Sequence, residues 1–349
     1  MGHFSPNYSN ILHRAGTIKS ANKRGSVRPD RRHYLYLATA SALTLAALPL
    51  ERLIANYPQS EQEPFKLPPF EDPGIEEAEL IRFMQRAGVS TGVTEDHELT
   101  DSIYLTKVRH FDENFVDDFY LPAEFKAVQR KVLGKILAVA SHVGTGEFNV
   151  MSYPGLLKWA DHIPDIGKFG KDELAFMEML YEEDARRYGF QGEKVTDRLT
   201  HKISKQEIYL LRDSGQSLFR GNALDLYKRM KKDVGNNLIV TSGVRGVPKQ
   251  MQLFLGKIMA TGGNLSRASR SIAPPGYSWH GRGDFDVGRR GYGLRNFTSH
   301  FLLTPEYRKL VSLGYVKPRY PRDNRMGVRY EPWHIHAGES EPTAFPVVS

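Results

Sequence analysis

Between positions 121 and 188, apolar residues recur at spacings of three and four, which is the period of an amphipathic helix. Two stretches show this most clearly, 121–143 and 171–188. The second begins with acidic residues and ends with arginines, an order that suits the helix dipole. We therefore expect residues 76–204 to form a mainly helical region.

After residue 204, short apolar runs alternate with amphipathic stretches. Residues 223–234 and 248–259 are expected to be helices, and Pro248 suits the first turn of the second. Three runs predict strands: 237–241, 285–287 and 328–336. The order favours an α+β fold, in which a domain over 205–340 has a small antiparallel sheet with flanking helices and follows the mainly helical region.

The longest uncharged run near the N-terminus covers 34–50 and follows a basic tail, 1–33. Its seventeen residues stand at the lower limit of about 17 for a bilayer crossing. A charged start followed by an apolar run is typical of a signal sequence or signal anchor, which we place at 34–51. The adjacent Arg31 and Arg32, just before the apolar run, resemble a twin-arginine export signal. Residues 52–75 are Pro-rich and acidic, as in an extended linker.

These N-terminal features predict export to the periplasm or cell envelope. The apolar run offers two alternatives, a cleaved signal or an inner-membrane tether through residues 34–50.

The composition of the 349 residues is ordinary for a globular protein, with 40% apolar and 25% charged residues. The length allows more than one domain. Because the chain contains no cysteine, disulfides and thiolate metal sites are excluded, and any metal must be held by nitrogen and oxygen atoms.

The net charge of +8 is divided unevenly along the chain. Residues 34–200 carry 17 basic and 28 acidic side chains, whereas 201–349 carry 24 basic and 11 acidic ones. A basic C-terminal region attracts anionic material, including cell-wall polymers. Aromatic and basic residues are not interleaved as in nucleic-acid-binding modules, so we expect no nucleic-acid partner.

Two stretches near the C-terminus, 278–286 and 331–336, hold the parts of a hydrolytic metal centre. A catalytic zinc takes three protein ligands from His and carboxylates, keeps a position open for water and has a nearby carboxylate as base. The candidate ligands and base are His280, Asp286, His334 and Glu331. Two of the three tryptophans, Trp279 and Trp333, adjoin these positions, which indicates a walled pocket.

Two of the candidate ligands have a rival two residues away. Alternate side chains of a strand share a face, so Asp284 accompanies Asp286, and His336 accompanies His334. One member of each pair is expected to bind metal, and the other to orient a ligand or bind substrate.

The two stretches resemble the zinc D-alanyl-D-alanine carboxypeptidases and dipeptidases, the VanY-type members of the lysostaphin, D-Ala-D-Ala metallopeptidase and hedgehog group (LAS). The similarity lies in Ser-x-His-x-x-Gly followed by Asp, and in Glu-x-Trp-His. Earlier in the chain, Ser242-Gly243-Val244-Arg245 is similar to the family's Ser-Gly-Tyr-Arg segment, which also precedes a helix carrying a Gln. The resemblance covers about residues 205–340 and implies a LAS-like fold.

The resemblance implies three Zn²⁺ ligands and a general base, namely His280, Asp286, His334 and Glu331. Arg245 would stabilise the oxyanion, a role that suits a permanently charged guanidinium. The residues implied to hold the peptide or its terminal carboxylate are Ser242, Gln250, Ser278 and Trp333.

The sequence departs from the family pattern in two places. Asp286 follows His280 by six residues rather than seven, and the glycines between them make the shorter turn feasible. Val244 stands where Tyr is common, which removes a hydroxyl from the pocket. His336 stays a rival to His334 because lysostaphin-type sites use the second His of a His-x-His pair.

We expect a zinc metallopeptidase that hydrolyses D-alanyl-containing peptidoglycan stem peptides, with carboxypeptidase, dipeptidase and endopeptidase activity all compatible with the motifs. The alternative is a non-catalytic metal-binding module that retains the fold and binds the wall. Glu331 favours the enzyme, because a binding module needs no base. A serine peptidase is excluded: Ser-x-x-Lys occurs at 20–23 in the basic tail, and no Lys-Thr-Gly follows.

Overall fold

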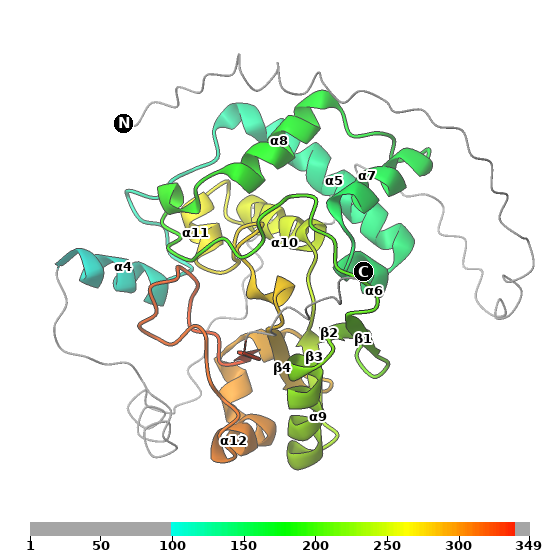
Figure 1. The fold of residues 1–349 in the computed structure, drawn as a ribbon. Helices are drawn as coiled ribbons and strands as arrows, with labels where there is room; N and C mark the ends of the chain where they lie inside the picture. The colour runs from blue at the N-terminus through cyan, green and yellow to red at the C-terminus, as the bar shows by residue number, and fades with distance from the viewer. Residues whose placement is uncertain (1–98, 339–349) are drawn as a thin grey trace, which may run out of the picture. The chain divides into compact units, whose positions relative to one another are not determined.

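A computed structural model describes residues 99–338 (Figure 1). The expected tail, signal segment and linker, residues 1–75, lie outside the described residues. The chain divides into two units, Met1–Leu48 and Pro49–Ser349, and everything described belongs to the second. Within the described part, no helix is both long and apolar enough to cross a membrane.

Helices fill the first part of the described chain, as the apolar spacing predicts. They are α4 (Leu99–Arg109), α5 (Lys126–Val143), α6 (Thr145–Asn149), α7 (Tyr153–His162) and α8 (Lys171–Glu182), with 3₁₀ turns η1 (Ala123–Phe125) and η2 (Ala185–Tyr188). The helix predicted over 121–143 is confirmed as η1 and α5. The one predicted over 171–188 is interrupted, because α8 ends at Glu182 and the Asp184 side chain caps the separate turn η2.

Strands and helices alternate after residue 204. The elements are β1 (Ile208–Leu211), β2 (Gln216–Phe219), α9 (Asn222–Val234), β3 (Leu238–Ser242), α10 (Val247–Ala260), α11 (Leu265–Ser269), η3 (Trp279–Gly281), β4 (Phe285–Arg289), η4 (Gly293–Phe297), η5 (Ser299–Leu303), α12 (Pro305–Ser312) and β5 (His334–Ile335). The two predicted helices and the first two predicted strands are confirmed within two residues at each end.

The strand predicted over 328–336 is wrong except for β5. The backbone N–H groups of Arg329 and Glu331 donate to Arg270 O and Tyr320 O rather than to a neighbouring strand, and Pro332 has no N–H. The apolar residues of this stretch therefore serve core packing instead of a sheet ladder.

Two small antiparallel sheets confirm the α+β class. Strands β1 and β2 form a hairpin, and β3, β4 and β5 form a three-stranded sheet with β4 in the middle. In the second sheet Ser242 pairs with Asp286, and Asp286 pairs with His334. The register thus aligns three polar residues across the sheet.

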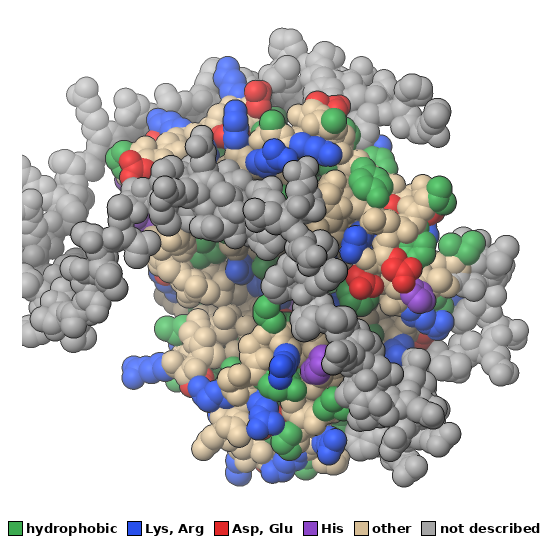
Figure 2. Space-filling model, turned by 180° about the vertical axis from the view of Figure 1, so that it is seen from behind, with side chains coloured by type: hydrophobic (Ala, Val, Ile, Leu, Met, Phe, Trp, Pro, Cys, Tyr) green, Lys and Arg blue, Asp and Glu red, His purple; other side chains and the backbone are tan. Residues whose placement is uncertain are grey.

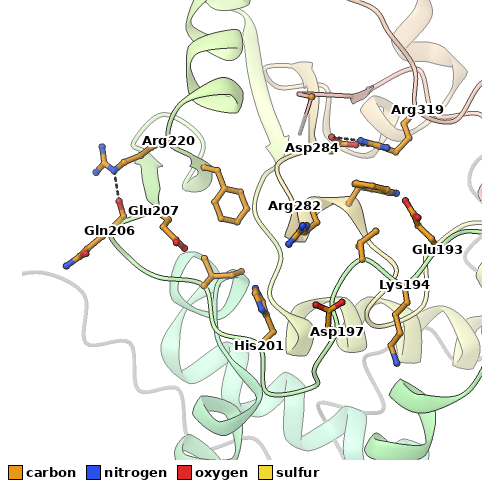
Figure 3. Close-up of a pocket in the computed structure, with 16 residues that line it drawn as sticks. Glu193, Lys194, Asp197, His201, Gln206, Glu207, Arg220, Arg282, Asp284 and Arg319 are labelled. Atoms are coloured by element: carbon orange, nitrogen blue, oxygen red, sulfur yellow. Dashed lines mark hydrogen bonds and ion pairs between the residues drawn. The ribbon is translucent and has the colours of Figure 1, made fainter. Parts of the chain in front are cut away.

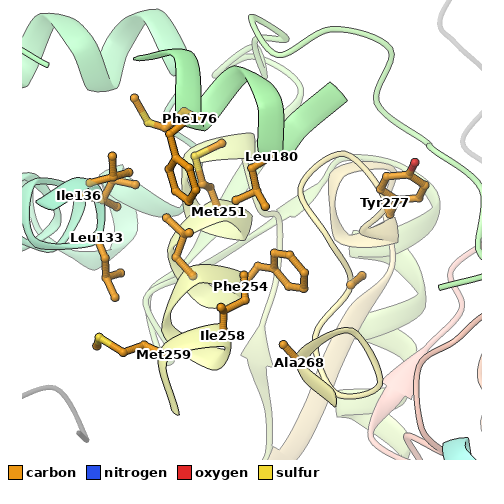
Figure 4. Packing of buried hydrophobic residues seen from close by; sticks show 14 of the residues in the cluster. Leu133, Ile136, Phe176, Leu180, Met251, Phe254, Ile258, Met259, Ala268 and Tyr277 are labelled. Atoms are coloured by element: carbon orange, nitrogen blue, oxygen red, sulfur yellow. The ribbon is translucent and has the colours of Figure 1, made fainter. Parts of the chain in front are cut away.

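Two hydrophobic clusters support these elements. The first joins α5, α8, α10 and α11, where Ile136, Phe176, Phe254 and Ile258 are buried (Figure 4). The second packs the three-stranded sheet on α9 and α12, with Phe285 and Val287 of β4 pointing into it. Because α10 packs on α5, the first cluster extends across the boundary expected at residue 204.

Part of the positive charge of residues 201–349 lies on α9 and α12, which contact each other at the lower end of Figure 1. Figure 2 shows Lys and Arg side chains gathered at the same end, seen from behind. The exposed basic residues of these helices are Lys228, Arg229, Lys232, Arg308 and Lys309.

Candidate metal centre

The three-stranded sheet and the turn before it bring His280, Asp286 and His334 together. Phe285 and Val287 face the core, so Asp286 between them faces the opposite side, beside its register partner His334. His280 comes from turn η3. All three side chains are buried, and one nitrogen or oxygen atom from each lies within 4.8 Å of the others.

Two of the distances between these atoms are close to those of a tetrahedral metal site. Asp286 Oδ1 lies 3.3 Å from His280 Nε2 and 3.1 Å from His334 Nδ1. Ligand atoms about 2.0–2.2 Å from a tetrahedral zinc are roughly 3.3–3.6 Å apart. Two imidazoles and one carboxylate also match the donor set that zinc accepts in the absence of cysteine.

Hydrogen bonds at the far side of each ring orient the two imidazoles. His280 Nδ1 lies 2.9 Å from Gly243 O, which turns Nε2 toward Asp286. His334 Nε2 lies 2.9 Å from Asp284 Oδ2, which turns Nδ1 toward Asp286. Partners of this kind fix the tautomer of metal-binding histidines.

The structure separates the two members of each rival pair. Asp284 lies behind His334, where it also contacts Arg319, His336 and the backbone N–H of Ala337. His336 likewise contacts Asp284 rather than Asp286. Asp286 and His334 therefore belong to the cluster, and Asp284 and His336 form the layer behind it.

Glu331 lies beside this cluster, with Oε2 3.9 Å from His334 Nδ1. Burial raises the pKa of Glu331 to about 7, against the pull of the neighbouring His334. A carboxyl group with a pKa near neutrality is suited to exchange a proton with water. This position and pKa match those of a general base.

Burial lowers the pKa of His280, and the nearby Arg245 lowers it further, which favours the neutral form that a metal ligand requires. Burial alone would raise the pKa of Asp286, but His280, His334 and Arg245 hold it well below its usual range. For His334, hydrogen bonds to Asp284 and Asp286 outweigh burial and raise its pKa to about 9. The carboxylates of Asp284 and Asp286 thus favour a positive charge on the His334 ring or next to it.

Arg245 extends over the cluster from the chain that joins β3 to α10. Its Nη2 donates to Asp286 Oδ2 at 3.0 Å and its Nε to Ser242 Oγ at 2.9 Å. Its Nη1 lies 3.5 Å from Gln250 Oε1, and the Gln250 amide donates to Ala273 O. Ser242 and Gln250 therefore orient the guanidinium.

Two glycines allow the backbone contacts that anchor this segment. A Cβ on Gly243 would lie 2.0 Å from Ser217 O, and one on Gly246 would lie 2.3 Å from Met151 O. Neither position leaves room for a side chain. The contacts attach the start of α10, and with it Arg245, to β2 and to the chain that follows α6.

A cavity of about 320 Å³, here called the metal cavity, opens on this cluster. Its walls include eight of the nine residues that the sequence nominated: Ser242, Arg245, Ser278, His280, Asp286, Glu331, Trp333 and His334. Gln250 is not among the lining residues and acts through Arg245.

Sequence reasoning missed several polar residues that also line the metal cavity. They are Asn149, Gln216, Thr241, Lys249, Ser271 and Arg329. Thr241 and Lys249 adjoin nominated residues, which was a usable signal. Asn149 and Gln216 come from α6 and β2 and meet only in the fold, where Asn149 Nδ2 donates to Gln216 Oε1 at 3.1 Å.

A second groove of about 680 Å³ lies on the other side of turn η3 (Figure 3). Trp279, Gly281 and Asp284 line it, whereas Ser278, His280 and Asp286 line the metal cavity. Arg319 also lines this groove, with its guanidinium 3.7 Å from the centre of the Trp279 ring. The turn is therefore the wall between the two cavities.

Comparison with known proteins supports the resemblance read from the motifs. Residues 218–337 match the family described as "VanY: D-alanyl-D-alanine carboxypeptidase", a range that contains every nominated site residue. The VanY-type resemblance is thereby confirmed for this region. A solved structure, VanYB in complex with D-Alanine-D-Alanine, is 22% identical over 41% of this chain and 82% of that chain, with a TM-score of 0.32. No curated protein matches the chain.

Proposed function

We propose that residues 205–340 form a zinc-dependent peptidase that removes D-alanine from peptidoglycan stem peptides, as a D,D-carboxypeptidase. The VanY family match over 218–337 supports the reaction class. The observation that carries the proposal is the convergence of His280, Asp286 and His334, with one ligand atom from each within 4.8 Å of the others, beside a buried Glu331.

Each group has a distinct part in the proposed reaction. A bound zinc ion would polarise the scissile carbonyl and lower the pKa of water at the site. Glu331 would accept the proton of the attacking water and pass it to the leaving amine, a transfer that a pKa of about 7 favours. Arg245 would stabilise the negative charge that develops on the carbonyl oxygen.

The remaining nominated residues would hold the peptide, either directly or by orienting Arg245. Ser242 and Gln250 keep Arg245 in place, while Ser278 and Trp333 line the metal cavity. A substrate in the cell wall agrees with the export that we expect from residues 34–51, so we propose that the enzyme acts in the periplasm or cell envelope.

The substitution Glu331→Gln tests the mechanism. It removes the base but keeps the side-chain volume, so zinc content should be retained while D-alanine release falls about 100- to 10,000-fold. Elemental analysis measures the metal, and mass spectrometry of purified muropeptides measures the product. Glu193→Gln, an exposed change in the second groove, is the matched control and should leave both unchanged.

Equal turnover by Glu331→Gln and the wild type would remove Glu331 from the mechanism. A wild-type protein that binds zinc and muropeptides without releasing D-alanine would instead support the non-catalytic wall-binding module.

A further inference from the structure

The metal cavity contains a cation that has no counter-ion in the described part of the chain. Lys249, in the first turn of α10 beside Gln250, lines the cavity. Its Nζ donates to Gln252 Oε1 at 2.9 Å and lies 5.9 Å from the centre of the Phe148 ring. Among the described residues, no carboxylate lies within 4.0 Å of it.

The surroundings of Lys249 favour a bound anion. Burial lowers the pKa of Lys249 to about 8, and the neighbouring Arg245 acts in the same direction. A partly buried ammonium close to a second cation is stabilised when a negative group enters beside it. Arg245 already pairs with Asp286, whereas Lys249 has only the neutral Gln252 amide.

The walls of the metal cavity also hold unpartnered polar atoms. In the described structure, four buried atoms that line it have no hydrogen-bond partner: Asn149 Oδ1, Thr241 Oγ1, Ser271 Oγ and Arg329 Nε. None of the residues lining the second groove has such an atom. Because buried polar groups are normally paired, water or a polar ligand in the metal cavity would supply the partners of these atoms.

We propose that Lys249 binds the terminal carboxylate of the peptide and thereby makes the site select substrates with a free C-terminus. The inference rests on the proposed peptidase function and names the residue that would decide carboxypeptidase against endopeptidase activity. Arg245 pairs with Asp286 and is proposed to serve the reacting carbonyl, whereas Lys249, four residues further along the chain, pairs with no carboxylate of the described residues and would bind that of the departing residue.

Two substrates that differ only in charge at the C-terminus test the proposal. The zinc-loaded full chain is given a peptide ending in D-Ala-D-Ala and the same peptide as its C-terminal amide. The wild type should prefer the free acid. Lys249→Met keeps the apolar stem, and it should lower kcat/KM for the acid about 30- to 100-fold, mainly through KM, while hydrolysis of the amide stays unchanged.

The same helix supplies a matched control. Lys257 is a partly buried lysine of α10 whose pKa burial also lowers to about 8, yet it does not line the metal cavity. Lys257→Met should keep the wild-type preference for the acid. Lys249→Arg retains the charge and should recover part of the preference, whereas Lys249→Gln should lose it. Circular dichroism and zinc content establish that each variant is folded and loaded.

Three outcomes separate the alternatives. Equal losses on acid and amide, or an unchanged preference in Lys249→Met, would overturn the role of Lys249 while leaving the peptidase function intact. Hydrolysis of neither peptide by the wild type would refute the peptidase function instead. Calorimetry with the zinc-loaded protein then decides the carboxylate site, because only the free acid should bind tightly and only Lys249 variants should weaken it.

Discussion

Two buried aspartate–arginine pairs in different parts of the described chain show how a structural carboxylate differs from a candidate ligand. Asp118 pairs with Arg270 at 2.8 Å where the loop after α4 meets α11, and Asp286 pairs with Arg245 at 3.0 Å in the metal centre. All four side chains are largely buried. The exposed fraction is 1% for Asp118 and 6% for Arg270 in the first pair, and 3% for Asp286 and 14% for Arg245 in the second.

The difference lies in what surrounds each carboxylate. Asp118 accepts hydrogen bonds from the Phe115 backbone, the Asn264 amide and both terminal nitrogens of Arg270, all of which can only donate. Asp286 faces two imidazoles, which can give up their protons and offer lone pairs to a metal. A buried Asp–Arg pair alone therefore does not indicate a metal site; the imidazoles and the cavity do.

A third pair lies between these extremes. Asp284 is bonded to Arg319 on the side of the second groove and to His334 on the side of the metal cavity. Like Asp118, Asp284 is surrounded by hydrogen-bond donors, but it also contacts the candidate ligand His334. We assign it to positioning His334 rather than to the metal.

The largest effect that would test this comparison is on stability. Asp118→Ala leaves Arg270 buried and uncompensated and should cost about 3–5 kcal/mol of the free energy of unfolding, measured by urea denaturation. Asp117→Ala removes the neighbouring exposed carboxylate, which pairs with Lys107, and should cost no more than about 1 kcal/mol. Zinc affinity should be unchanged in both variants; a weaker zinc site in Asp118→Ala would contradict a purely structural role.

The next effect concerns metal affinity at the two neighbouring aspartates. A structural zinc site releases about 10–16 kcal/mol on binding, so each of four ligands contributes roughly 2.5–4 kcal/mol. Asp286→Ala should lose about that much, whereas Asp284→Ala should weaken binding about 10- to 100-fold, as expected for a group that only orients a ligand. Competition with a chromophoric chelator measures both. The reverse order would make Asp284 the ligand.

The fold could be predicted where the signal is local. The apolar spacing of α5 and α10 and the short buried runs of β3 and β4 follow from residues a few positions apart. The stretch 328–336 misled because its alternating apolar residues pack in the core while its N–H groups bond to distant loops. The hairpin β1–β2 and helix α12 were not anticipated, because each strand has 4 residues and the helix only 8, too few to repeat a pattern.

The site residues that could be predicted are those that lie close together in the sequence. His280 and Asp286 lie in one short stretch, and Glu331 and His334 in another, so chemistry and spacing alone nominate them. The choice between Asp284 and Asp286 required the register of β4 with β5 and the contact of Asp284 with Arg319, 35 residues away. Asn149 reaches the cavity only because α6 packs beside β2.

The smallest predicted effect is the pH dependence of the structural pair. Burial alone would raise the pKa of Asp118, but Arg270 and the Phe115 and Asn264 donors hold it below its ordinary value of 3.8. A carboxyl whose pKa is lower in the folded state adds stability above its unfolded pKa, and loses it as the pH falls through the folded value. The free energy of unfolding of the metal-free wild type should therefore exceed that of Asp118→Asn at pH 7, and the gap should narrow below about pH 4.

Because Asn keeps the volume of Asp, the gap at pH 7 should be smaller than that for Asp118→Ala. Urea titrations at pH 7, 5, 4 and 3 measure it, and a gap that stays constant down to pH 3 would mean that the ionised carboxylate does not stabilise the fold. Saturating zinc at pH 7 should raise the stability of the wild type and Asp118→Asn equally, since the pair acts on folding and the metal on the other carboxylate.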